Sequence, residues 1–259
     1  MRASASSLRA LVVGGGGFLG TNLVHALRDA GHEVAVTHRG RALPFHLRGH
    51  VQRATRCDLG DVEALCVAMR GCDVVLHAAG HYPRHSQEGA VAVETALRET
   101  RNLVSAARRE GVGRVVYTSS IAVLRGPQED DTHAEAPEDS VYRAVKWHIE
   151  RVLDDARREG TDVVTLRPGG CLGPWDLRGG TGALLVAVVR GELPWFVDGT
   201  IHMVDVRDVA RAHVAALHVT DAAHYNLAGH TLTARALFQR VVARHGGRLP
   251  AVELGPDEA

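Results

Sequence analysis

The chain has 259 residues, 45% of them hydrophobic and 23% charged, and its 30 basic residues balance 30 acidic ones. This composition excludes a disordered or fibrous chain, and a net charge of zero supplies no general field to attract nucleic acid or an anionic membrane surface. We therefore expect a folded α/β protein, either one domain or one domain with a small appendage, whose partner is a small molecule.

The polar N-terminal stretch 1–9 leads into an apolar run that is short and turns directly into glycines. Such a run is too short for a signal peptide or a membrane span. We therefore expect a cytoplasmic protein with no membrane partner.

Short apolar runs then alternate with amphipathic stretches of helix length as far as residue 167. The apolar runs predict buried parallel strands, and the stretches between them have apolar positions at helical spacing. The predicted strands are 10–13, 33–37, 51–55, 73–77, 114–119 and 162–167, and the predicted helices are 18–31, 61–71, 90–110 and 141–159. Gly31, Gly71, Gly111 and Gly160 follow these helices, where glycine readily closes a C-terminus. The pattern predicts a Rossmann-type, doubly wound parallel sheet.

The remainder of the chain is expected to form a small substrate-binding lobe, 169–259, interleaved with the core of the dinucleotide-binding domain, 1–168. The segment 167–182 is rich in Gly and Pro, and we predict a substrate-side loop there that is too irregular for a strand. Beyond it the pattern predicts helices at 181–190, 206–217 and 233–245, an extended piece at 195–198 and a strand at 225–227.

Three glycines follow the first predicted strand at three-residue spacing and open the first helix. Gly14 would make the tight turn, Gly17 would allow close backbone approach, and Gly20 would let the helix pack on the strand. With the helix N-terminus facing the phosphates, this arrangement is typical of a dinucleotide-binding loop.

The end of the second strand bears on the choice of nicotinamide cofactor. An acidic residue there would bind the adenosine ribose hydroxyls, but the segment 37–41 carries Arg39 and no carboxylate. A guanidinium can pair with a 2′-phosphate, so NADP is favoured and NAD stays possible. Asp58, after the third strand, could accept a hydrogen bond from the adenine amino group, while Asp61 could cap the next helix.

Tyr142 and Lys146 lie four residues apart in a predicted helix, so both side chains share one face. A lysine ammonium near a phenol lowers its pKa, so that the tyrosine can exchange a proton with a carbonyl or an alcohol. Upstream, a predicted strand ends in Thr118, Ser119 and Ser120, at the sheet edge where open α/β folds bind ligands. A hydroxyl there can polarise a substrate carbonyl.

With these residues the sequence resembles the extended short-chain dehydrogenase/reductase superfamily, the family of NAD-dependent epimerases and dehydratases, over almost the whole chain. The motifs that carry the resemblance are VVGGGGFLG, CDLGD, DVVLHAAG, TRNLVSAA, RVVYTSS, YRAVK, LRPGGCLGPWD, VDVRDVARAH and YNLAG, in the expected order. Within the family, the sequence is most similar to dihydroflavonol-reductase-like reductases and hopanoid-associated sugar epimerases. It departs from the family pattern at Val13, at Ala96 and at Leu124 and Arg125, and the C-terminal lobe ending at Ala259 is shorter than in most members.

The resemblance implies a role for individual residues. Ser120, Tyr142 and Lys146 match the catalytic triad, and Lys146 would also hold the nicotinamide ribose. Cofactor contacts are further implied for Phe18, Leu19, Leu59, Ala78, Ala79 and Gly169. The helices 90–110 and 141–159 form the dimer face in many relatives, so a homodimer is expected.

The leading hypothesis is an NADP-dependent oxidoreductase that reduces a ketone or oxidises a secondary alcohol. An alternative is a nucleotide-sugar epimerase or dehydratase, for which Arg178, Arg207 and Arg211 are the candidate diphosphate ligands, although Arg207 could equally form a structural ion pair. A second alternative is a sensor that binds NADP and turns over nothing.

The cysteines and histidines do not indicate a metal site. Cys57, Cys66, Cys72 and Cys171 form no CxxC pair and are expected to be thiols. The histidines are scattered, and the run His77, His81 and His85 is interrupted by Gly80 and Pro83, which argues against one ligand-bearing helix.

Overall fold

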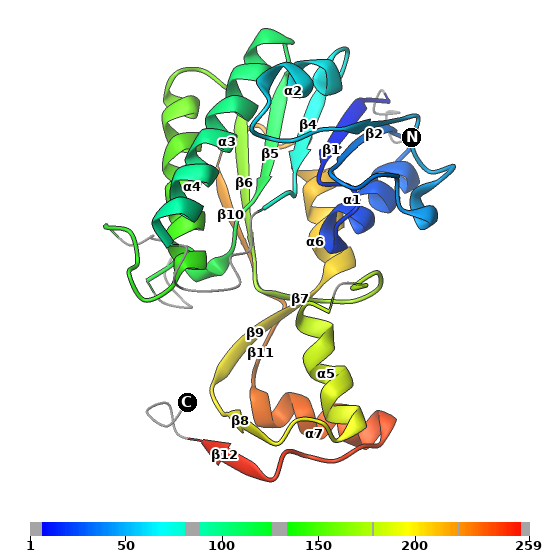
Figure 1. The fold of residues 1–259 in the computed structure, drawn as a ribbon, viewed down its shortest axis with the longest axis vertical. Coiled ribbons are helices and arrows are strands. Elements are labelled where there is room, and N and C mark those ends of the chain that lie inside the picture. Colours follow the sequence, from blue (N-terminus) through cyan, green and yellow to red (C-terminus); the bar gives the residue numbers. More distant parts are fainter. Residues whose placement is uncertain (1–6, 81–88, 126–133, 178, 222, 255–259) are drawn as a thin grey trace.

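The computed structural model describes residues 7–80, 89–125, 134–177, 179–221 and 223–254 (Figure 1). Its larger lobe is built on a seven-stranded sheet of order β10-β6-β5-β4-β1-β2-β3, in which all neighbouring strands are parallel. The strands are β1 Arg9–Val13, β2 Glu33–His38, β3 Arg53–Arg56, β4 Val74–His77, β5 Arg114–Thr118, β6 Val163–Pro168 and β10 His224–Leu227. This topology confirms the predicted Rossmann-type fold.

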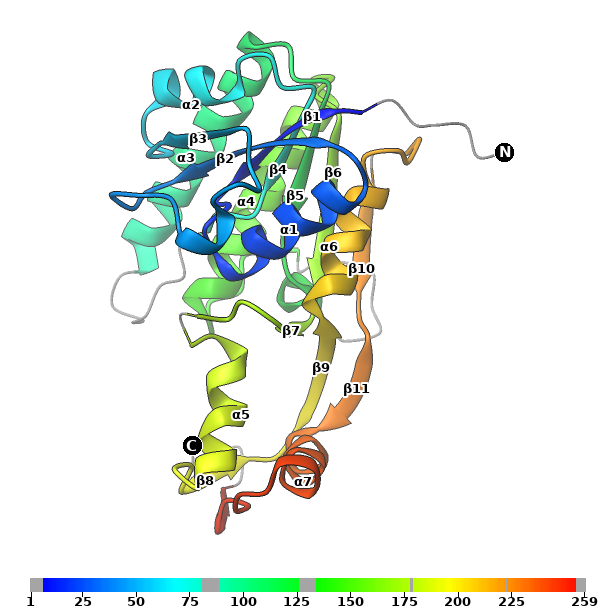
Figure 2. The same cartoon turned by 90° about the vertical axis from the view of Figure 1, so that its right-hand side faces the viewer.

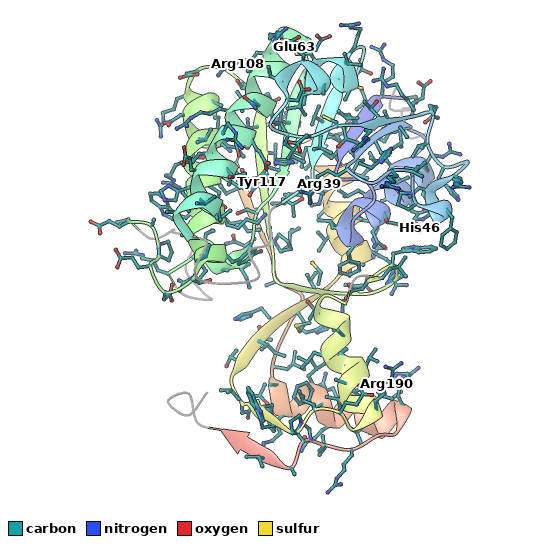
Figure 3. All side chains as sticks on the ribbon, viewed as in Figure 1. Arg39, His46, Glu63, Arg108, Tyr117 and Arg190 are labelled. Atoms are coloured by element: carbon teal, nitrogen blue, oxygen red, sulfur yellow. The ribbon has the colours of Figure 1, made fainter. Side chains whose placement is uncertain are left out.

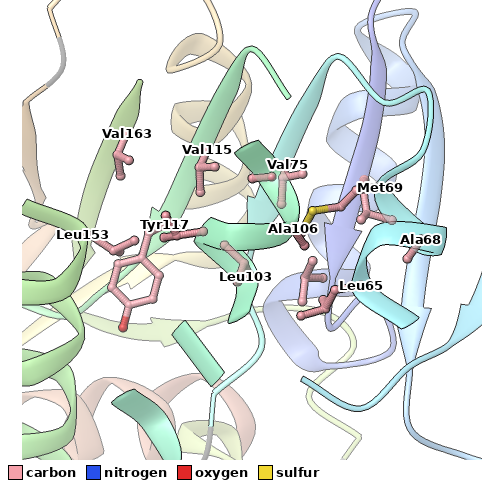
Figure 4. Packing of buried hydrophobic residues seen from close by; sticks show 14 of the residues in the cluster. Leu65, Ala68, Met69, Val75, Leu103, Ala106, Val115, Tyr117, Leu153 and Val163 are labelled. Atoms are coloured by element: carbon pink, nitrogen blue, oxygen red, sulfur yellow. The ribbon is translucent and has the colours of Figure 1, made fainter. Parts of the chain in front are cut away.

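Helices cover both faces of this sheet, which explains why its central strands are apolar throughout rather than alternating. One face carries α1 Phe18–Asp29 and α6 Val206–Ala215, which pack against each other. The other carries α2 Val62–Met69, α3 Gly89–Arg109 and α4 Val141–Arg158. Figure 4 shows the second layer, where Leu65, Leu103 and Leu153 from these three helices meet the strand residues Val75 and Val115.

The helix ends follow the local sequence. The four glycines predicted to close helices have φ between +68° and +90°, which confirms the prediction. At the other end, Asp61 accepts a hydrogen bond from the Ala64 N–H at 3.0 Å and caps α2. Ser140 caps α4 in the same way, which fixes the start of the helix that carries Tyr142 and Lys146.

The smaller lobe lies beyond the C-terminal ends of the sheet strands (Figure 2). A three-stranded sheet of order β11-β9-β7 leads into it, and β8 pairs with β12 at its far end. Its elements are β7 Gly170–Leu172, α5 Thr181–Arg190, β8 Trp195–Val197, β9 Thr200–Asp205, β11 His230–Thr233, α7 Ala234–His245 and β12 Val252–Leu254. Val188, Phe196, Ala234 and Phe238 form a small separate core. The chain then enters the larger lobe again and forms α6 and β10 there.

One prediction in this region is wrong. Residues 170–172, expected to lie in a loop too irregular for a strand, form β7 and pair in parallel with β9. Glycine makes this pairing possible, since a Cβ at Gly169 would lie 2.6 Å from the His202 carbonyl oxygen and one at Gly170 would lie 2.8 Å from the Met203 sulfur. The glycines that suggested irregularity therefore serve close contact between strands.

Some expectations concern residues outside the described ranges, namely those for His81, His85 and Arg178. The four cysteines are free thiols. Among the described residues, no three His, Cys, Asp or Glu side chains are grouped to hold a metal ion. None of the described helices is both long enough and apolar enough to cross a membrane.

A buried ion pair fixes α4 to the sheet. Arg167 of β6 donates from Nε and Nη2 to the two carboxylate oxygens of Glu150 on α4, at 3.0 and 2.7 Å. The side chains are 4% and 0% exposed, so neither charge has water to compensate it. The pair therefore sets where α4 lies along β6.

We expect Arg167→Met to lower the free energy of unfolding by about 3–5 kcal/mol, because it leaves the Glu150 carboxylate buried without its partner. Denaturant unfolding followed by circular dichroism measures the loss. The control is Arg158→Met, which removes an exposed ion pair with Asp155 on the same helix and should change stability little. Equal effects of the two variants would contradict the interpretation.

Candidate functional site

The glycine turn after β1 is closed by contacts that leave no room for a side chain. Gly14 has φ +85°, and a Cβ on it would lie 2.8 Å from the backbone of Ala79. A Cβ on Gly20 would lie 2.2 Å from the Gly14 carbonyl oxygen. Gly17 precedes α1 and offers no side-chain cap, so the first N–H groups of that helix are available to an anion.

A pocket of about 210 Å³ opens beside this turn. Six of the predicted cofactor residues line it: Gly14, Gly17, Arg39, Leu59, Ala78 and Ala79. They come from the β1–α1 turn, from the loops after β2 and β3, and from the segment after β4, all at the C-terminal edge of the sheet. The fold therefore gathers residues from four distant segments around one cavity.

The other predicted cofactor residues do not line this pocket. Phe18 and Leu19 form the first turn of α1. Asp58 is exposed, and its Oδ1 accepts a hydrogen bond from the Gly60 N–H at 2.8 Å, which shapes the loop after β3. Gly169 lies against β9, as described above.

Arg39 (labelled in Figure 3) lies on the pocket wall at the end of β2. Its guanidinium is exposed and pairs with no carboxylate in the part of the chain that the structure describes. Within the loop 37–41, His38 Nδ1 lies 3.1 Å from the Gly40 carbonyl oxygen, which orders the backbone beside Arg39. The end of β2 thus presents a positive charge to the pocket.

Sequence reasoning missed two residues of α3 near this pocket. Glu99 is one of its lining residues. Asn102 donates from Nδ2 to the carbonyl oxygens of Leu59 and Gly60, at 3.0 and 3.1 Å, and so holds the loop after β3. Both are polar residues on the inward side of an amphipathic helix, and this position could have indicated a role for them from the sequence.

Lys146 reaches from α4 to the end of β5. Its Nζ donates to the Thr118 carbonyl oxygen at 2.7 Å and to the Tyr117 phenol oxygen at 3.2 Å. Burial lowers the pKa of Lys146 to about 8, although the Glu150 carboxylate acts in the opposite direction. Tyr142 is partly exposed and lies one helical turn before Lys146, in the first turn of α4.

Of the three hydroxyl residues at and after the end of β5, only Ser120 is not buried. Thr118 is hydrogen bonded to His213 Nε2 at 2.8 Å, and the Ser119 hydroxyl is buried without a partner among the described residues. Ser120 Oγ accepts from the Ala122 N–H at 3.2 Å, which leaves its own O–H free to donate. Arg143 donates to the Ala122 carbonyl oxygen at 2.9 Å and so ties the start of α4 to this turn.

The two described candidates for binding a diphosphate are engaged elsewhere. Arg207 forms an ion pair with Asp205 at 2.5 Å, and Arg211 pairs with Asp208. Both pairs are on the surface at or near the N-terminus of α6, where Asp205 also caps the helix. In this structure Arg207 forms the structural ion pair that the sequence left as an equal possibility.

The chain matches the model of the NAD dependent epimerase/dehydratase family over residues 10–228. It is 31% identical over 79% of its length to a putative dihydroflavonol 4-reductase from Synechocystis, and covers 62% of that protein. It is 30% identical over 95% of its length to cinnamoyl-CoA reductase 2 from Arabidopsis thaliana, and covers 80% of it.

Solved structures show the same fold. A nucleoside-diphosphate-sugar epimerase from Pseudomonas aeruginosa superposes with a TM-score of 0.85 at 26% identity, over 98% of this chain and 82% of that one. The UDP-glucose 4-epimerase from Thermus thermophilus in complex with NAD gives 0.79 at 28% identity, over 96% and 87%. Sequence, fold and family model agree, and the chain belongs to the NAD-dependent epimerase/dehydratase family of the extended short-chain dehydrogenase/reductase superfamily.

Proposed function

We propose that this protein is an NADP-dependent oxidoreductase that interconverts a ketone and a secondary alcohol. The observation that carries the proposal is the partly buried ammonium of Lys146, one turn from the partly exposed Tyr142 and next to the end of β5 that leads to Ser120. This is the arrangement that acid–base catalysis by a phenol requires.

The residues around the pocket fit a dinucleotide. A Cβ on Gly14 or Gly20 would collide with the backbone, so the turn keeps a shape that brings the N–H groups at the start of α1 to the cavity. Gly14 and Gly17 would approach the pyrophosphate, Leu59 and Asp58 the adenine, and Arg39 the 2′-phosphate of NADP. Ala78 and Ala79 would lie along the cofactor, with Phe18, Leu19 and Gly20 supporting the loop. Lys146 would hold the nicotinamide ribose, and Gly169 would approach the nicotinamide.

Each residue of the triad has a distinct task. When bound, the nicotinamide supplies or accepts the hydride. Tyr142 donates its phenolic proton to the carbonyl oxygen, or takes one from the alcohol in the reverse direction. Lys146 favours the phenolate form through its positive charge, and Ser120 donates a hydrogen bond to the same substrate oxygen.

The comparisons support a reductase through relatives at 30–33% identity that are named as reductases. The likeness to UDP-glucose 4-epimerase favours a second candidate, a nucleotide-sugar epimerase, which needs the same proton transfer and side chains that bind the diphosphate of the substrate. Arg207 and Arg211 would have to leave their ion pairs to bind that diphosphate.

We expect Tyr142→Phe to lower the turnover of a reducible ketone by about 10²- to 10⁴-fold, because the proton donor is lost. NADPH oxidation across a panel of ketones, followed at 340 nm, measures this, and fluorescence titration should show nearly unchanged NADPH affinity. Tyr225→Phe, at a half-buried tyrosine of β10, is the control and should retain full turnover.

The same panel separates the alternatives. Tight NADPH binding without turnover of any ketone would favour a sensor. Conversion of a UDP- or dTDP-sugar without net consumption of cofactor would favour the epimerase. A Tyr142→Phe variant as active as the parent protein would overturn both enzymatic proposals.

We expect Arg39→Ala to reduce the preference for NADPH over NADH by about tenfold or more, because a charge-assisted contact with the 2′-phosphate is lost. The ratio of the two dissociation constants measures the effect. Arg41→Ala changes an exposed arginine of the same loop that does not line the pocket, and should leave the ratio unchanged. A ratio that stays constant in Arg39→Ala would refute the assignment of NADP.

A homodimer through α3 and α4 is also part of the proposal, by resemblance to the family. The molar mass in solution, measured by light scattering, should be twice that of the 27.8 kDa chain. A strictly monomeric mass would refute it.

A further inference from the structure

Tyr117 is a second tyrosine beside Lys146, and none of the proposed steps uses it. It lies in β5 and is 0% exposed, with its ring in the core between the sheet and α4 (Figure 4). Its phenol oxygen accepts a hydrogen bond from Lys146 Nζ at 3.2 Å, and the same nitrogen lies 4.9 Å from the centre of its ring. A phenylalanine would fill the same volume, so packing alone does not explain the hydroxyl.

The other groups around Lys146 leave its ammonium without a carboxylate of its own. Glu150, one turn later on α4, has both oxygens bound by Arg167 of β6. From β4, His77 is held neutral, since burial and the nearby Lys146 lower its pKa to about 3. Tyr142 lies one turn before Lys146 on α4, whereas Glu150 lies one turn after it. Among the described residues, Nζ thus donates its hydrogen bonds to two neutral acceptors, the Thr118 carbonyl oxygen and the Tyr117 phenol oxygen.

Towards the Lys146 ammonium, which has only N–H donors, Tyr117 acts as a neutral hydrogen-bond acceptor. Its pKa is raised well above the ordinary value by burial, by the Glu150 carboxylate and by Tyr142, so it remains a neutral phenol. A neutral acceptor stabilises the ammonium over the amine and also restricts where Nζ can lie. The Thr118 carbonyl oxygen fixes the direction of one N–H bond of Nζ, and the Tyr117 phenol oxygen fixes the direction of a second.

We propose that Tyr117 is a positioning residue, whose phenol oxygen holds the Lys146 ammonium in place and in its charged form beside Tyr142. The importance of this for catalysis rests on the proposed function. The hydrogen bond itself does not, and it can be tested without substrate.

Lys146 is the only lysine in the chain, which makes the test direct. Protein grown with [6-¹³C]lysine gives one side-chain signal, and its chemical shift against pH reports the pKa of Lys146. We expect a midpoint near 8 in the parent protein. In Tyr117→Phe the midpoint should fall by about one pH unit, because the charged form loses an acceptor. Tyr225→Phe should leave it unchanged.

The pH dependence of turnover should change in the same direction as the pKa of Lys146. If Lys146 must be charged, the pH at which kcat falls on the alkaline side should be lower by the same amount in Tyr117→Phe, with KM for the ketone unchanged at pH 6.5.

A folded Tyr117→Phe with the parent midpoint would overturn the proposal, as would a parent midpoint near 10.5. If that variant does not fold, the test uses the parent protein. A nuclear Overhauser effect between the Lys146 ε-methylene and the Tyr117 ring is expected there, and its absence refutes the proposal. A protein that reduces no ketone but shows the shift would refute the proposed function alone.

Discussion

The site depends on accommodating one positive charge, the Lys146 ammonium, where it is only partly exposed to water. Burying an ammonium is unfavourable unless its hydrogen bonds are satisfied and a counter-charge is near. Lys146 meets this requirement with a carbonyl and a phenol from β5, while Glu150 compensates from a distance and is itself fixed by Arg167. Three elements, β5, β6 and α4, must therefore be in register before the charge can be accommodated. Burial lowers the pKa of Lys146 and the Glu150 carboxylate raises it, so the two effects act in opposite directions on the same charge.

The pocket beside the glycine turn obeys a different constraint, which is steric. The backbone of the glycine turn lies so close to Ala79 and to the start of α1 that no β-carbon fits at Gly14 or Gly20. Ala79 directly follows Ala78 at the end of β4, and β4 lies between β1 and β5 in the sheet. The turn and the charged side of the site are consequently parts of one packed unit rather than two attachments to a scaffold.

Much of the fold was predictable because its signals are local. The glycine spacing, the pair Tyr142 and Lys146, and the apolar runs of the parallel sheet each occupy a short stretch of sequence. The strands of the smaller lobe were not predictable in this way: β11 is mostly exposed, and β7 is a three-residue strand that begins at a glycine in a Gly- and Pro-rich segment and pairs with β9, about 30 residues further along the chain. Tyr117 and Asn102 were missed for a related reason. Each looks like an ordinary strand or helix residue, and its partner comes from an element 29 or about 43 residues away in the chain.

The path of the chain between the lobes has a consequence for how the protein can be divided. It crosses outward from β6 to β7, returns from β9 to α6, and crosses outward again from β10 to β11. A fragment that stops at residue 168 would lose α6, whose Ala210 packs in the core beneath α1, and would leave β6 as an unpaired sheet edge. The larger lobe is thus a unit of architecture but not a unit of sequence, and recombination that exchanges the smaller lobe must replace one insertion, between β6 and α6, and one C-terminal segment after β10.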